Sequence, residues 1–141
     1  MLIRTLAISL LLTAAALAAP TVSQLSKAPT EVTIGQASVK VDKAFVWRDA
    51  QNFESKNLIV RVELENLPQG ARITGVYLLN KDQLWGVPHP EVHFSDKSQM
   101  ATARGGPAWD GDSKVDVVVE VTRSGQVYRL RLPAQPISRV D

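Results

Sequence analysis

The sequence predicts an all-β protein, namely a single antiparallel β-sandwich of about seven to eight strands that follows an N-terminal signal peptide. Three observations predict this fold. Apolar and polar residues alternate with a period of two along most of the chain after residue 30, turn-forming residues separate the alternating stretches, and no stretch of useful length has helical periodicity. Such alternation is typical of strands with one buried and one wet face, so two sheets are expected to enclose a core.

The chain is expected to have four parts. They are a signal peptide at residues 1–18, a flexible N-terminal lead at 19–30, the β-sandwich at 31–133 and a C-terminal tail at 134–141. The sandwich resembles immunoglobulin and fibronectin domains in outline only. The cysteine–tryptophan–cysteine pattern of true immunoglobulin domains is missing, because the chain has no cysteine.

The first eighteen residues have the three features of a secretory signal peptide. Arg4 gives a positive start, residues 6–17 form an apolar run, and Ala16-Leu17-Ala18 offers a small-residue cleavage site, with cleavage expected after Ala18. The protein is therefore expected to be exported, either to a bacterial periplasm or out of the cell. It has no cysteine for a lipoprotein anchor and no later apolar run long enough for membrane insertion.

Composition disfavours several classes of partner and activity. The chain has 16 basic and 14 acidic residues, and the basic residues do not cluster, so neither nucleic acid nor an anionic membrane surface is expected as a partner. No nucleophile elbow, P-loop, zinc-protease helix or dinucleotide fingerprint is present. The sequence therefore predicts a protein that is not an enzyme and that needs no cofactor.

Residues 115–132 give the best-determined structural prediction, a hairpin. A two-residue turn at Ser124-Gly125 sets Arg123 opposite Gln126 and fixes the register. The inward pairs that follow are Val121 with Tyr128, Val119 with Leu130, and Val117 with Leu132. On the outer face the same register places Glu120 opposite Arg129, so one register satisfies both faces.

Earlier strands are predicted from the same alternation. Residues 58–65 are the clearest, with Arg61 and two glutamates on the wet face. The stretch from 37 to 47 is expected to form a long strand with Trp47 on its buried face, and Gly35 marks a bulge or turn before it. Further along, residues 48–56 are predicted as a loop, residues 72–79 as a strand and residues 80–83 as a turn.

The alternation breaks down between residues 85 and 113, so this irregular segment is the candidate functional region. Its candidate partner-binding residues are Trp85, His89, His93, Arg104 and Trp109. A tryptophan would be the apolar anchor, with arginine and histidine at the rim, because aromatic residues and arginine dominate binding hot spots. The alternative is structural: short edge strands at 92–94 and 100–103, with the tryptophans fixing the segment onto the core.

A metal site is the second hypothesis for this segment. In an extended chain His89, Glu91 and His93 share one face, and Met100 could add a soft ligand, which suits copper or zinc. Closely spaced carboxylates at 110–112 could bind calcium, but Asp-Gly and Asp-Ser are ordinary turn residues and the turn is favoured.

Together these observations predict an exported binding module of the cell envelope that acts through residues 85–113. Such a module could be an adaptor, an inhibitor or a carbohydrate- or protein-binding domain, and its partner is expected to be a protein or glycan of the envelope. The alternatives are a copper- or zinc-binding protein and a structural protein that pairs through a sheet edge. A monomer or weak homodimer is expected.

Overall fold

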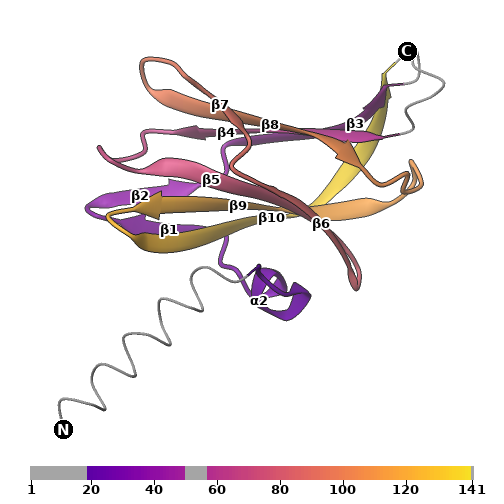
Figure 1. Ribbon diagram of the computed structural model, residues 1–141, viewed down its shortest axis with the longest axis horizontal. Helices are drawn as coiled ribbons and strands as arrows, with labels where there is room; N and C mark the ends of the chain where they lie inside the picture. Colours follow the sequence, from indigo (N-terminus) through magenta and orange to yellow (C-terminus); the bar gives the residue numbers. More distant parts are fainter. Residues whose placement is uncertain (1–18, 50–56, 141) are drawn as a thin grey trace, which may run out of the picture.

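The computed structural model describes residues 19–49 and 57–140, so the predicted signal peptide and most of the predicted loop at 48–56 lie outside the described residues. The described elements follow one another along the chain, first a short helix and then ten strands (Figure 1). They are α2 (Val22–Ser26), β1 (Glu31–Ile34), β2 (Ala37–Lys40), β3 (Lys43–Asp49), β4 (Leu58–Glu65), β5 (Arg72–Asn80), β6 (Gln83–Pro88), β7 (Glu91–Phe94), β8 (Ser98–Gly106), β9 (Lys114–Arg123) and β10 (Gln126–Val140).

Eight of the described strands form one mixed sheet in the order β6-β5-β9-β10-β3-β4-β8-β7. All neighbours are antiparallel except β10 and β3, which run parallel, and β1 and β2 form a separate hairpin. The sheet curls into a half-barrel, so that β3, β4, β8 and β7 lie over β5, β9 and β10 (Figure 1). We call these the upper wall and the lower wall.

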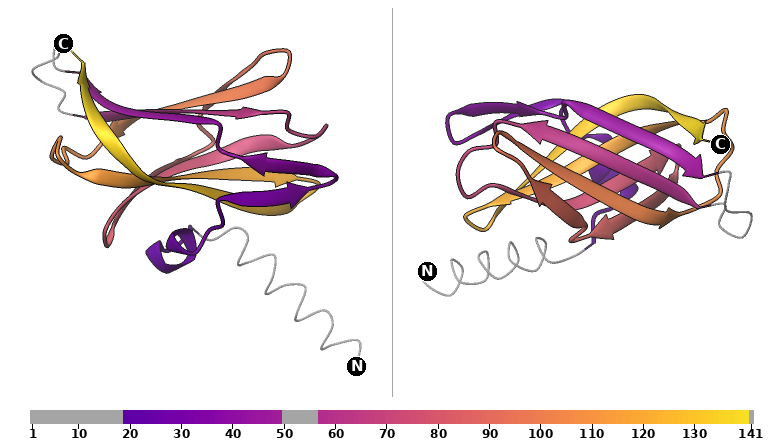
Figure 2. Two further views of the ribbon diagram at one scale, coloured as in Figure 1. Left: turned by 180° about the vertical axis from the view of Figure 1, so that it is seen from behind. Right: turned by 90° about the horizontal axis from the view of Figure 1, so that it is seen from above.

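The protein is all-β as predicted, but the expected sandwich of two separate antiparallel sheets is wrong. β10 pairs with β9 along its first part and with β3 from Ile137 onward, which joins the two walls. Its register shifts between Leu132 and Gln135, and Ala134 adopts a φ of 56°. A bulge of this kind bends a strand, so a single strand runs from the lower wall into the upper one (Figure 2).

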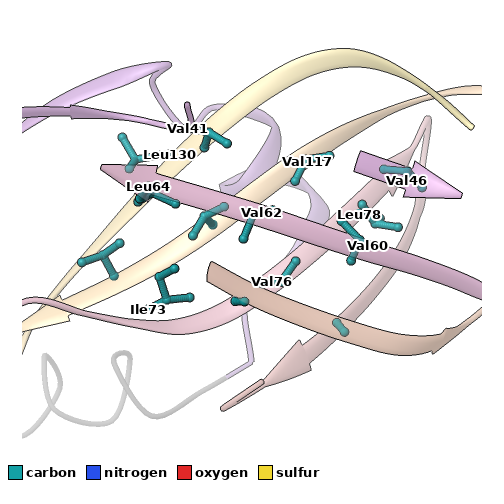
Figure 3. Packing of buried hydrophobic residues seen from close by; sticks show 14 of the residues in the cluster. Val41, Val46, Val60, Val62, Leu64, Ile73, Val76, Leu78, Val117 and Leu130 are labelled. Carbon is teal, nitrogen blue, oxygen red and sulfur yellow. The ribbon is translucent and has the colours of Figure 1, made fainter. Parts of the chain in front are cut away.

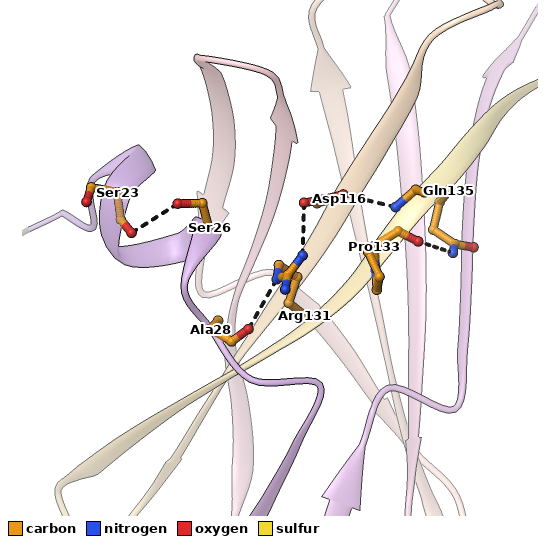
Figure 4. Close-up of polar contacts among 8 residues, drawn as sticks. Ser23, Ser26, Ala28, Asp116, Arg131, Pro133 and Gln135 are labelled. Carbon is orange, nitrogen blue, oxygen red and sulfur yellow. Dashed lines mark hydrogen bonds and ion pairs between the residues drawn. The ribbon is translucent and has the colours of Figure 1, made fainter.

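The same bulge explains why the structure differs from the predicted C-terminal tail. Residues 134–140 belong to β10, and Ile137 is buried in the core. Proline is tolerated at bulges, so the prolines here do not end the strand. Asp116 of β9 holds the bulge, because its Oδ1 accepts a hydrogen bond from the Ala134 amide at 2.9 Å (Figure 4).

The core lies between the inner faces of the two walls (Figure 3). β4 alternates as predicted, with its four aliphatic residues at even positions fully buried. Side chains of the upper wall meet those of the lower wall, and the largest fully buried ones include Leu58, Val60, Val62, Leu64, Ile73, Val76, Leu78 and Leu130.

Gln99 of β8 is a buried polar side chain that links the two walls inside this core. Its Nε2 donates to the carbonyl of Ala71 at 2.8 Å, and its Oε1 accepts from the amide of Ile73 at 3.1 Å. One amide group therefore satisfies two backbone groups at the start of β5 without a direct strand pairing between β8 and β5.

The hairpin of β9 and β10 has the predicted register. Arg123 pairs with Gln126 across Ser124-Gly125, and the inward pairs are those expected from the sequence. The Arg129 Nε lies 3.3 Å from a carboxylate oxygen of Glu120. The predicted turn at Gly35 is also confirmed: Gly35 has a φ of 62° and lies between the paired strands β1 and β2.

The helix α2 lies in the segment predicted as a flexible lead and covers the outer face of the lower wall (Figures 1 and 2). Leu25 is fully buried there among a second, smaller cluster of apolar side chains, with Ala28, Tyr77, Leu79 and Val118. Thr21 caps the helix through a capping box with Gln24. Five residues are too few to produce a helical period, which is why sequence patterning did not reveal it. Among residues 19–49 and 57–140, no helix is long and apolar enough to cross a membrane.

Candidate functional site

Most of the segment predicted as irregular, residues 85–113, forms regular strands. It contains most of β6 and all of β7 and β8, followed by the connection to β9. This arrangement agrees in part with the alternative of edge strands at 92–94 and 100–103. Both segments form strands, and β7 lies at an edge of the sheet, but β8 lies between β4 and β7. The turn alternative at 110–112 also holds, since the Ser113 amide donates to the Asp110 carbonyl at 3.0 Å.

The two candidate tryptophans of this segment, Trp85 and Trp109, are half-buried and contact the core cluster. Trp85 stands opposite Leu78 in the pairing of β6 with β5, and a Cβ on Gly106 would lie 3.3 Å from its ring. Trp85 therefore packs between the edge strand β6 and the end of β8.

The three ligands proposed for copper or zinc do not share one face. His89 lies in the turn before β7 with a φ of 51°, and its amide donates to the Thr74 carbonyl at 2.9 Å. Glu91 and His93 are both on β7, where the His93 Nε2 lies 2.9 Å from the Glu91 Oε1 and each side chain is 67% exposed. Nowhere in the described residues do three or more histidine, aspartate or glutamate side chains lie where they could hold a metal ion.

His89 instead lines a cleft of about 550 Å³ on the outer face of the lower wall, together with Tyr77 and Glu120. Thr74 joins the polar side of this cleft, because its hydroxyl donates to the Glu120 carboxylate at 3.1 Å. Burial, followed by the nearby Glu120 carboxylate, raises the pKa of Tyr77 above its usual value. The Tyr77 ring covers Gly86, where a Cβ would overlap the ring.

Trp47 is not on the buried face of its strand, which corrects the sequence prediction. Val46 is buried, whereas Phe45 is 59% exposed and Trp47 is half-buried on the other face of β3. The alternation changes phase at Asp42, between β2 and β3, where the Asp42 amide donates to the Glu63 carbonyl. Continuing the phase of Val41 would have placed a charged residue, Lys43, in the core. That charge is the signal in the sequence that could have identified the phase change.

Strand register maps the outer face of the upper wall as three rows of side chains. The first row is Trp47, Ile59 and Arg104. The second row is Phe45, Arg61, Thr102 and Glu91. The third row is Lys43, Glu63, Met100 and His93. We call the nine residues of β3, β4 and β8 in these rows the platform. Glu91 and His93 border it on β7.

Aromatic side chains dominate one side of the platform. The rings of Phe45 and Trp47 meet edge to face, with centroids 6.1 Å apart and planes at 68°. The Arg61 guanidinium carbon lies 5.7 Å from the Trp47 ring centroid, which is within the range of a cation–π contact. Beside these rings is a depression of about 540 Å³, lined by Lys43, Ala44, Phe45, Trp47, Arg61, Val62, Glu63 and Met100.

Nothing among the described elements covers the platform. Figure 2 (right) shows β3, β4, β8 and β7 nearest the viewer, with α2 behind the sheet. The platform thus combines an exposed phenylalanine, a half-buried tryptophan, a flexible methionine and two arginines on one sheet face, a composition typical of binding surfaces.

Four of the residues singled out in the sequence lie on this face, namely Arg104, His93, Met100 and Glu91. Sequence reasoning placed them in the functional region but missed the residues of β3 and β4 beside them. Comparison with protein-family models, with curated protein sequences and with solved structures finds no match to this chain.

Proposed function

We propose that the protein is an exported binding module that captures a macromolecule of the cell envelope through the platform. Export rests on the sequence of residues 1–18. Binding rests on one observation above all: the Phe45–Trp47 aromatic pair lies on a sheet face that no described element covers.

Energetics support a binding role for this face. Apolar surface that stays exposed after folding contributes no hydrophobic free energy to stability. A partner that buries this surface stabilises the complex by roughly 25 cal/mol for each Å² removed from solvent. Trp47 is already partly oriented by Phe45 and Arg61, so it would lose less side-chain freedom on binding than an unsupported side chain.

Relative to the sequence hypothesis, the proposal keeps the function and changes the site. Residues 85–113 contribute Met100, Thr102 and Arg104 to the platform, but the aromatic anchors come from β3 instead of Trp85 and Trp109. The proposal includes no reaction, because it needs only complementarity of shape and charge across the sheet face.

Site-specific photocrosslinking in the producing cells tests the proposal. We would replace Phe45 with the photoreactive amino acid benzoylphenylalanine and compare it with the same replacement at Phe94. Phe94 is a matched control because it is also a phenylalanine of the upper wall, is 60% exposed and lies off the platform.

We expect covalent adducts from position 45 that are absent at position 94 and that weaken when Trp47→Ala is added. Equal labelling at the two positions, or no adduct at 45, would overturn the proposal.

A further inference from the structure

The charges of the platform are not balanced evenly across it. Glu91 and His93 contact each other at the β7 border, and Lys43 stands directly opposite Glu63. Arg61 and Arg104 are different, since the register places no carboxylate directly opposite either one, and no carboxylate of the described residues forms an ion pair with them. Two guanidinium groups therefore border the aromatic side of the platform without an acidic partner.

Strand register places these two arginines close together. Arg104 stands opposite Ile59, and Arg61 stands opposite Thr102, so the arginines are diagonal neighbours on adjacent strands. Diagonal neighbours in an antiparallel pair are roughly 7–8 Å apart. Both side chains point away from the core, because Val60 and Ala103 between them are buried.

We propose that the partner presents an extended acidic protein segment, in which a carboxylate and an apolar side chain lie two positions apart. This inference rests on the proposed function and names the chemistry of the partner. The apolar side chain enters the depression beside Phe45 and Trp47, and the carboxylates bind Arg61 and Arg104.

The spacing of the platform matches an extended chain. Neighbouring rows are two residues apart along each strand, and side chains two positions apart in an extended segment are separated by about 6.6–6.8 Å. A segment lying along the strands thus sets successive same-face side chains against successive rows. The planar guanidinium binds a carboxylate through two parallel hydrogen bonds, which gives such a segment a preferred position.

A protein segment fits this surface better than a glycan. Every sugar hydroxyl that loses water needs a hydrogen-bonding partner. Trp47, through its indole N–H, and Thr102 are the uncharged side chains of the platform that form ordinary hydrogen bonds, and five of the eight residues that line the depression are apolar. Met100 also suits apolar side chains of varied shape, because its thioether chain is flexible.

Fluorescence anisotropy with a defined probe tests the inference. The probe is a fluorescein-labelled peptide with two glutamates two positions apart, to match Arg104 and Arg61, followed two positions later by a phenylalanine, with serines between them. Control peptides replace both glutamates with glutamine, or the phenylalanine with serine. Neutral xylohexaose and anionic hexagalacturonate serve as competitors that represent glycans.

Arg61→Gln and Arg104→Gln are the test variants, and Arg72→Gln is the matched control. Arg72 lies over the Phe94 ring at 5.7 Å, the same distance as Arg61 over Trp47, but lies off the platform. Arg104 makes no cation–π contact with a ring of residues 19–49 or 57–140, so its variant tests charge without disturbing such a contact. Far-UV circular dichroism verifies that each variant is folded.

We expect the acidic peptide to bind and each test variant to weaken it by about tenfold or more, as lost charge-assisted hydrogen bonds predict. Arg72→Gln should change the affinity by less than about twofold, because its charge lies outside the platform. Three results would overturn the inference. They are binding of the glutamine peptide as tight as that of the acidic peptide, no binding of the acidic peptide, and displacement of the acidic peptide by either oligosaccharide. Adducts at position 45 would still stand in those cases, so failure here is distinguishable from failure of the proposed function.

Discussion

The outer faces of the two walls carry similar side chains but meet different surroundings. On the lower wall Tyr77, Leu79 and Val118 are buried beneath α2. On the upper wall no helix of the described part of the chain lies over Phe45 and Trp47. Among residues 19–49 and 57–140, a capped helix covers the apolar outer face of the lower wall, and no element covers that of the upper wall. The lower wall shows that this chain can cover an apolar outer face with a helix of its own. This difference supports a separate role, in binding, for the aromatic face of the upper wall.

The segment that follows α2 is held against the lower wall by hydrogen bonds. Arg131 of β10 donates from its Nε to the Ala28 carbonyl at 3.1 Å and lies 3.4 Å from the Asp116 carboxylate (Figure 4). The Arg131 amide also donates to the Pro29 carbonyl at 2.9 Å. The segment after the helix is thus fixed to Arg131 of β10, which also lies against Asp116, the residue that holds the bulge.

Removing the cover should have the largest effect on stability. Leu25→Ala deletes the fully buried side chain of α2 and should lower the free energy of unfolding by about 2–5 kcal/mol. Urea denaturation measures this change. Leu25→Met, which keeps the volume, should cost less than about 1.5 kcal/mol. A loss of under 0.5 kcal/mol on Leu25→Ala would show that α2 does not stabilise the lower wall.

The link between the two walls should come next. Gln99→Met keeps a side chain of similar size but leaves the Ile73 amide and the Ala71 carbonyl without their partner. Buried groups left unpaired in this way destabilise by about 1–3 kcal/mol, again measured by urea denaturation. Gln83→Met at an exposed position is the control and should be close to neutral. An equal effect of the two substitutions would contradict the role of Gln99.

Tyr77 on the covered face predicts that the stability of the protein depends on pH. Burial raises the pKa of Tyr77, which means that folding favours its protonated form. The contribution of Tyr77 to stability is therefore complete below its unfolded pKa of about 10 and falls as the pH rises further. The difference between tyrosinate absorbance titrations of the wild type and Tyr77→Phe should show a midpoint above 10. A midpoint at or below 10 would mean that water reaches this face.

Truncation on the open face should have the smallest effect on stability. Phe45→Ala should change the free energy of unfolding by about 0.5 kcal/mol or less, because the side chain is mostly exposed. The comparison with Leu25→Ala is direct, since Leu25 packs against the outer face of the lower wall and Phe45 lies on the outer face of the upper wall. A loss as large as that of Leu25→Ala would make Phe45 a structural residue and would remove the distinction between the two faces.

Local patterns in the sequence predicted the strands better than their assembly. The β9–β10 hairpin was predictable because its turn and both of its faces required one register. The continuity of the sheet was not, since it depends on a bulge at Ala134 that bends β10 toward β3, whose paired residues lie 91 positions earlier in the chain. No local period records such a long-range pairing.

The sequence predicted the platform residues of β8 but not those of β3. Arg104 and Met100 lie in a segment where loss of alternation drew attention. Phe45, Val46 and Trp47 are apolar residues in succession that fit either phase, so the alternation alone predicts the wrong face for Trp47. The two phases differ at Lys43, because the phase that buries Trp47 also places Lys43 in the core. This signal can be used only if β2 and β3 are recognised as separate strands.

Oxidative footprinting of the open face tests the central claim most directly. Hydroxyl radicals would be applied to the purified protein and to intact producing cells, and the modification of Phe45, Trp47 and Phe94 compared by mass spectrometry. The account predicts that Phe45 and Trp47 are modified in the purified protein and protected in cells, whereas Phe94 is modified equally in both. Equal modification of all three residues in the two samples would contradict a partner-covered platform.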